Sequence, residues 1–453
     1  MRLRLCAAMM AVIGVVVGPA QYSLAQGGAP APAPAPIGPQ LNPPDYVFNS
    51  NIPSDIVTIR VGANGTQVFV NNLAWNTFLA VNWPAPQPLA ERGVPDRQNV
   101  TGGFQYSTDF GKRTMPTGPV VWETYKDTND IFQNPPVKPA AFDAAPIIPK
   151  ACAALAKIDP AAALHVLRDT TQAFSGKPLI DQNGQKVWYE VKVNRAYYDY
   201  VVNNGFYDSR KQIGKTINFP SASNVTSQAP VVKVKAAWKI MGNGDVPAQF
   251  YTSKALLFDP KADTCSDQPV GLVGLHVVQK TQQFQQWAWA TFEHVANAPD
   301  KAVTEGHYNF YNPACSATQC PLNTYPSPTG PTQVVRLVPV DSTATGSNAT
   351  FQAALKSLRD DNVWQNYMLV DSQWGPLTPE LPLGKPQQPL FLANATMETY
   401  LQAPEPARAP HGCINCHGEF AQTDGRTDDL DFQISKAFPH TKKTEELLKS
   451  FMH

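Results

Sequence analysis

Two cysteines and a histidine stand close together near the end of the 453-residue chain, which reads Cys-Ile-Asn-Cys-His over residues 413–417. Thiols three positions apart lie on one side of a helical turn, where both can form thioether bonds to the two vinyl groups of one porphyrin. A histidine directly after the second thiol can then reach the iron with a ring nitrogen. This spacing predicts covalent attachment of one c-type haem through Cys413 and Cys416, with His417 as an iron ligand.

The same two cysteines could instead form a thioredoxin-like redox pair or half of a zinc site. A zinc site would need a second pair of ligands at the spacing of a metal finger, and a redox pair would need a βαβ frame around it. Neither is visible in the sequence near residues 413–417. The Cys and His frequencies of this chain predict about 0.002 chance matches to the haem-attachment pattern, which favours the haem interpretation.

The first 25 residues have the layout of a secretory signal, with two arginines, an apolar run and small residues at the cleavage positions. A retained N-terminal anchor is the alternative interpretation. Cleavage after Ala25 would leave 34 basic and 36 acidic residues, a net charge of −2. No later stretch approaches the 18 apolar residues that suggest a membrane span. The sequence therefore predicts a periplasmic or secreted protein, which agrees with haem attachment outside the cytoplasm.

The composition excludes one class of partner. Lys and Arg total 36, as do Asp and Glu, so the chain lacks the basic surplus that nucleic-acid binding needs. Hydrophobic residues make up 43%, enough for a sizeable core, whereas 43 prolines and only 16% charged residues argue against a helical bundle. Residues 26–44 include an alternating Ala-Pro tract, which predicts a semi-rigid polyproline II linker.

The pattern of apolar residues from 45 to 375 predicts an α+β fold, with a mainly antiparallel β body, a sheet or a sandwich, decorated by helices. Strands are predicted over residues 186–193, 231–240, 270–278 and 287–295, a hairpin around 63–65, and helices near 75–79 and over 160–174, 195–202 and 351–368. Prolines cluster over residues 376–391 and predict a joint. Residues 392–453 are then a small C-terminal haem-bearing segment.

Four cysteines remain outside the signal and the haem motif. An even number in an exported chain predicts two disulfides, for which three pairings are possible. Cys315 and Cys320 close a short loop and are the favoured pair, which leaves Cys152 with Cys265. A catalytic thiol among them is the alternative interpretation.

At residues 413–417 the chain resembles the cytochrome c family, over roughly the last 60 residues. This resemblance implies that Cys413 and Cys416 bind haem and that His417 binds its iron. The larger body also resembles a group of exported bacterial proteins that carry one such motif near the C-terminus, and this second resemblance implies no activity. The residues that carry it are 122–126, 235–238, 274–276, 289–294 and 397–400.

The residue on the other side of the iron separates two kinds of haem protein. Iron with two strong protein ligands transfers electrons, whereas iron with an open site binds small molecules. The sequence leaves this position open. His294 and His276 are favoured, because a haem on a short segment must bury its faces against the larger body. The other candidates are His440, Met397 and Met452.

Three functions are compatible with these features. The favoured one is single-electron transfer by a covalent haem, with a redox protein or a small-molecule electron donor or acceptor as partner. The second is a haem enzyme of the peroxidase or oxidase type, with an open sixth iron site and a substrate cavity in the body. The third is a module that binds a carbohydrate or a protein and uses haem as a redox reporter.

Overall fold

The computed structural model describes residues 49–56, 63–86, 91–96, 118–172, 175–222, 229–316, 318–326, 330–375, 389–402, 412–420 and 429–437. All of them belong to one compact unit, residues 38–453. The predicted signal, the predicted linker and most of the proline-rich joint lie outside the described residues, as do His440 and Met452.

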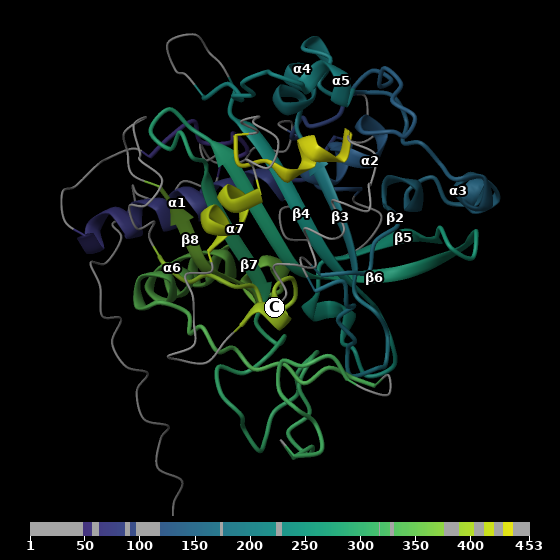
Figure 1. The fold of residues 1–453 in the computed structure, drawn as a ribbon. Helices are drawn as coiled ribbons and strands as arrows, with labels where there is room; N and C mark the ends of the chain where they lie inside the picture. Colours follow the sequence, from purple (N-terminus) through teal and green to yellow (C-terminus); the bar gives the residue numbers. More distant parts are fainter. Residues whose placement is uncertain are drawn as a thin grey trace, which may run out of the picture. The chain divides into compact units, whose positions relative to one another are not determined.

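The helices and strands of the described residues are shown in Figure 1. The α-helices are α1 (Ala63–Val81), α2 (Thr128–Ile131), α3 (Ala153–Ile158), α4 (Arg195–Asn203), α5 (Ser209–Gln212), α6 (Ser342–Leu358) and α7 (Cys413–Phe420). The strands are β1 (Lys126–Asp127), β2 (Val166–Leu167), β3 (Trp188–Val193), β4 (Val231–Ile240), β5 (Thr252–Asp259), β6 (Thr264–Lys280), β7 (Ala288–His294) and β8 (Tyr367–Trp374). Short 3-10 helices are η2 (Val121–Thr124), η3 (Lys150–Cys152), η4 (Ala162–Leu164), η5 (Pro247–Gln249), η6 (Val363–Asn366), η7 (Thr399–Leu401) and η8 (Phe432–Ala437).

The strands form one sheet that is organised around the long strand β6. β4 pairs with β6 along one side, while β5 pairs with its first half and β7 with its second half on the other side. β3 extends the sheet beyond β4, and β8 extends it beyond β7. These pairs are antiparallel, and β2 adds a short parallel pair with β5. The predicted α+β class is confirmed, and the described strands form a single sheet and no sandwich.

The sheet is covered on both faces, which explains why β4 and β7 are buried along nearly their whole length. On one face, aromatic side chains of α1 and α6 pack against β7: the Trp75 ring lies 5.1 Å from Phe292 and stacks on Phe351 at 5.2 Å. α7 packs against β8. Figure 1 shows α1 behind the sheet and α7 in front of it.

The hairpin predicted around residues 63–65 is wrong, because α1 begins at Ala63 and includes the residues assigned to the second strand. Val70, Leu73 and Trp75 are all buried. Tertiary packing along this helix therefore outweighs the turn propensity of the Asn-Gly pair in its first turn. The helical spacing predicted for Trp75 and Phe78 is confirmed, and both side chains are fully buried.

The helix predicted over residues 351–368 is displaced. α6 begins nine residues earlier, where the Asp341 carboxylate accepts a hydrogen bond from the Thr343 amide and caps the first turn. It ends at Leu358, and Tyr367 begins β8. The helix predicted over residues 160–174 is also wrong, since this segment contains η4 and β2. The predicted strand over 231–240 and the Asn194 cap of α4 are confirmed.

Both predicted disulfides are present, Cys152 with Cys265 and Cys315 with Cys320. The first joins η3 to β6 through cysteines that are 113 positions apart in the sequence, and the second joins cysteines that are five positions apart. Disulfides persist in oxidising compartments, so this pairing is compatible with an extracellular protein. In the part of the chain that the structure describes, we find no helix with the length and apolar character that a membrane crossing requires.

A buried network of charged groups lies on the face of β3 opposite to Val191. The imidazole of His165 bridges two carboxylates, with Nε2 2.9 Å from Glu123 Oε1 and Nδ1 2.7 Å from Glu190 Oε1. Burial disfavours the charged imidazole, but the charge of Glu190 and the two hydrogen bonds outweigh burial and raise the pKa of His165. Burial also disfavours the Glu190 carboxylate, yet His165 and Lys192 lower its pKa to about 2. The network is therefore an ion-paired part of the core.

Candidate functional site

α7 carries the two cysteines of the sequence motif and is attached to the sheet at its first turn. The amide of Ile414 donates a 2.7 Å hydrogen bond to Oε1 of Gln373 on β8. A side chain of the sheet thus satisfies one of the amides that the start of a helix leaves without a partner. Ile414 itself is 4% exposed and belongs to the main core. The contact of α7 with β8 therefore determines where the cysteines lie.

Gly412, directly before α7, has no room for a side chain, because a Cβ there would overlap the side-chain amide of Gln373. We expect Gly412→Ala to separate α7 from β8 and lower the free energy of unfolding by about 1–3 kcal/mol, measured by urea unfolding. The matched control is Gly346→Ala in α6, where the added Cβ meets no atom within 4 Å apart from its chain neighbours and the backbone of its own helix. This control should stabilise the protein by about 0.5–1 kcal/mol. Equal stability of the two variants would contradict the expected role of Gly412.

Cys413 and Cys416 belong to neither disulfide, and their half-buried side chains line one cavity, as their spacing predicts. Burial, together with the charges of Glu398 and Cys416, raises the pKa of the Cys413 thiol well above its ordinary value.

His417 lies between two aromatic rings at the edge of the same cavity. Its ring stacks on Phe432 with centroids 4.1 Å apart and contacts Trp289 of β7 at 4.4 Å. Nδ1 lies 2.7 Å from the carbonyl oxygen of Leu430, which can only accept a hydrogen bond. Burial and the nearby Lys233 lower the pKa of His417 well below its ordinary value, so the ring is neutral. Nδ1 then carries the proton, and Nε2 keeps its lone pair.

The cavity beside α7 has a volume of about 320 Å³, and one of its walls is a face of the sheet. Two rows of paired residues form this wall. One row runs from Val191 through Lys235 to His276, and the other from Lys233 through Val278 to Trp289. The second row continues to Gln373, which holds α7. Leu392, Leu401 and Phe432 also line the cavity.

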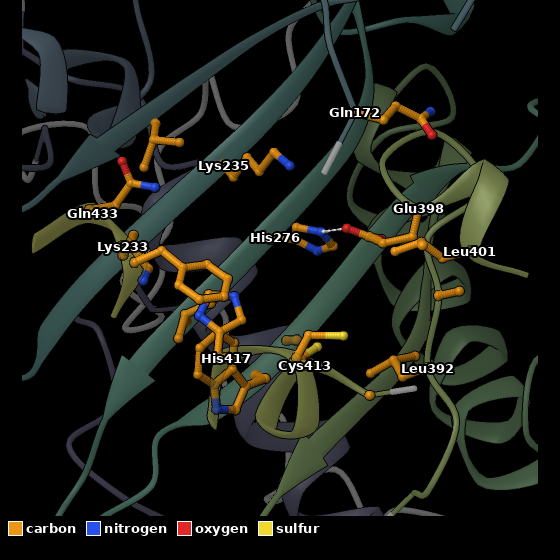
Figure 2. A pocket seen from close by; sticks show the side chains of 18 of the residues that line it. Gln172, Lys233, Lys235, His276, Leu392, Glu398, Leu401, Cys413, His417 and Gln433 are labelled. Atoms are coloured by element: carbon orange, nitrogen blue, oxygen red, sulfur yellow. Dashed lines mark hydrogen bonds and ion pairs between the residues drawn. The ribbon is translucent and has the colours of Figure 1, made fainter. Parts of the chain in front are cut away.

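Charged groups stand on the sheet side of the cavity (Figure 2). Nε2 of His276 lies 3.0 Å from Oε1 of Glu398, whose other carboxylate oxygen accepts the amide hydrogen of Asn394 at 2.9 Å. Lys233 forms a 2.6 Å ion pair with Asp431. Lys235 lies 5.4 Å from the centre of the Tyr189 ring, and no carboxylate of the described residues forms an ion pair with it. The sheet side thus offers Lys235, which forms no ion pair with a described residue, and one histidine–carboxylate pair.

The structure distinguishes between the residues that the sequence offers as the second ligand of the iron. His276 lines the cavity together with Cys413, Cys416 and His417. His294 does not, because its ring stacks on Phe250 at 4.2 Å, facing another hollow of the surface. Met397 is fully buried in a second apolar cluster, where its methyl group lies against Gly274. Of the candidates that the structure describes, His276 alone lies beside the motif.

Several residues of the site escaped the sequence analysis. Lys233 and Lys235 carried a signal, since charged side chains are rare at alternate positions of an otherwise apolar strand unless they have partners or a function. Gln373 and Glu398 carried none, because each reaches the site only through tertiary contacts.

Among the described ranges, no group of three or more His, Cys, Asp or Glu side chains is arranged to hold a metal ion by itself. Comparisons with protein-family models, with curated proteins and with solved structures found no match for this chain.

Proposed function

We propose that the protein is an exported c-type cytochrome that transfers single electrons. Cys413 and Cys416 would hold one haem by thioether bonds, and His417 would bind its iron. The observation that carries this proposal is the state of His417: a neutral ring beside two cysteines, with Nδ1 donating to a carbonyl and Nε2 available. Histidines that bind metals show this pattern of a ring N–H donated to an outer acceptor.

The remaining walls of the cavity fit a porphyrin in chemical character. A porphyrin has a broad apolar ring and two carboxylate side chains. Val278, Trp289, Leu392 and Phe432 supply apolar contact surface. Lys235, which makes no ion pair with another described residue, would be a partner for a carboxylate. The protein's own contribution would be to hold the haem, to orient it through α7 and to exclude water from its faces.

A bound haem would supply an iron centre that accepts and releases one electron. The partner would be a redox protein or a small-molecule donor or acceptor. The predicted signal supports a periplasmic or secreted location, and the two disulfides agree with an oxidising compartment.

The proposal is tested by producing the full chain in a bacterium that attaches haem to exported proteins. We expect one haem per chain from the absorbance of the alkaline pyridine complex. A redox titration should give a single reversible transition whose shape fits the transfer of one electron. Two results would contradict the proposal. One is folded protein that contains no haem. The other is haem that acidified organic solvent can extract, because such haem is not covalently bound.

A further inference from the structure

His276 lies on the same face of the sheet as the ring that supports His417. It pairs with Thr291 of β7, two residues from Trp289, and it is therefore a diagonal neighbour of Trp289. Such neighbours are about 7–8 Å apart. His417 contacts the Trp289 ring, and both imidazoles line the same cavity. Figure 2 shows both of them with Cys413 around one cavity.

Glu398 holds the ring of His276 in a defined state. Oε1 of the Glu398 carboxylate lies 3.0 Å from Nε2 of His276 and accepts a hydrogen bond from its N–H. In the neutral ring, Nδ1 then has a lone pair, and no described residue forms a hydrogen bond with it. Either ring nitrogen of a neutral histidine can bind a metal.

His276 and His417 thus share one arrangement. Each ring donates one N–H to an oxygen acceptor, Glu398 Oε1 for His276 and the carbonyl of Leu430 for His417. Each has a second nitrogen left over for a ligand. Outer acceptors of this kind fix the orientation of metal-binding histidines and increase their basicity.

His294 shows the contrasting case. Its Nε2 lies 2.9 Å from the carbonyl of Gln249, and its Nδ1 accepts the amide hydrogen of Ala296 at 3.2 Å. Both nitrogens are occupied, and burial lowers the pKa of this ring to about 4. His294 is therefore a hydrogen-bonded core residue with no nitrogen left for a metal.

We infer that His276 would be the second protein ligand of the haem iron and that Glu398 would be the positioning residue that orients it. This inference rests on the proposed function, because it needs a haem held by Cys413 and Cys416. It makes the protein a two-histidine electron carrier whose ligands come from distant parts of the chain, β6 and α7.

The test is the absorption and electron spin resonance spectrum of the ferric holoprotein. We expect a low-spin spectrum that cyanide leaves unchanged. His276→Ala should lose the low-spin signal, bind cyanide and recover a low-spin spectrum when free imidazole is added. Glu398→Gln should stay low-spin but show a higher midpoint potential, because an amide is a weaker acceptor for the ring N–H. A purely structural role of Glu398 would leave the potential unchanged.

His307→Ala is the matched control, since it removes an exposed histidine that does not line the cavity. Its spectrum should equal that of the parent protein. If the His276→Ala variant does not accumulate, His276→Met is used instead, since methionine can also bind the iron. A low-spin spectrum with a raised midpoint potential in that variant would support the same conclusion. A parent protein with covalent haem in a high-spin state would overturn the inference and leave the proposed function standing. A low-spin His276→Ala without added imidazole would do the same, whereas absence of covalent haem would overturn the proposed function itself.

Discussion

Replacement of Cys413 and Cys416 together by alanine is expected to remove all haem that survives denaturing electrophoresis. Thioether bonds persist when the chain unfolds, whereas a bond between His417 and iron does not. The measurement is the peroxidase stain of haem at the mass of the chain, normalised to total protein. We expect the stain to be lost completely. Cys413→Ala alone should keep a reduced signal, because one thioether can still form at Cys416.

The matched control removes the other closely spaced pair of cysteines. Cys315→Ala combined with Cys320→Ala deletes the same number of sulfur atoms from a loop whose cysteines do not line the cavity. The haem stain of this control should equal that of the parent chain. Equal staining in the two double variants would show that the haem is not held by Cys413 and Cys416.

His165→Ala is expected to destabilise the protein by about 3–5 kcal/mol, the usual cost of breaking a buried ion pair by removing one partner. His165 is 1% exposed and bridges Glu123 and Glu190, which are also buried. Without the imidazole, two carboxylates remain in the core with one fewer cation to balance them. Urea unfolding at neutral pH measures the loss, and an exposed-site variant, His307→Ala, should stay within about 0.5 kcal/mol of the parent.

The network also predicts how stability depends on pH. The pKa of Glu190 falls from an ordinary 4.5 to about 2, so its contribution is present above pH 4.5 and is lost as the pH falls toward 2. The pKa of His165 is raised above 6.5, so its contribution is full below pH 6.5 and is lost as the pH rises through the folded value. His165→Ala should flatten the decline in stability on the alkaline side and weaken the decline on the acidic side. Parallel stability curves for parent and variant would contradict an ion-paired His165.

Local sequence patterns predicted the structure correctly where it depends only on residues that are close together in the sequence. The helical turn that puts Cys413 and Cys416 on one side needs only their spacing, and the Asn194 cap of α4 needs only its own side chain. The apolar run over residues 231–240 predicted β4 with its correct ends. The Asn-Gly pair near the start of α1 was misleading, because burial of the helix against the sheet is a tertiary effect that the turn propensity does not contain.

The sequence by itself determined the spacing of Cys413, Cys416 and His417, the pairing of the disulfide-forming cysteines and the α+β class. Only the tertiary structure decided what surrounds the motif. Antiparallel pairing brings Lys233, Val278, Trp289 and Gln373 into one row, although they are up to 140 residues apart. The same pairing places His276 at the cavity. Register sets these neighbours, and register depends on the whole sheet rather than on any local run of residues.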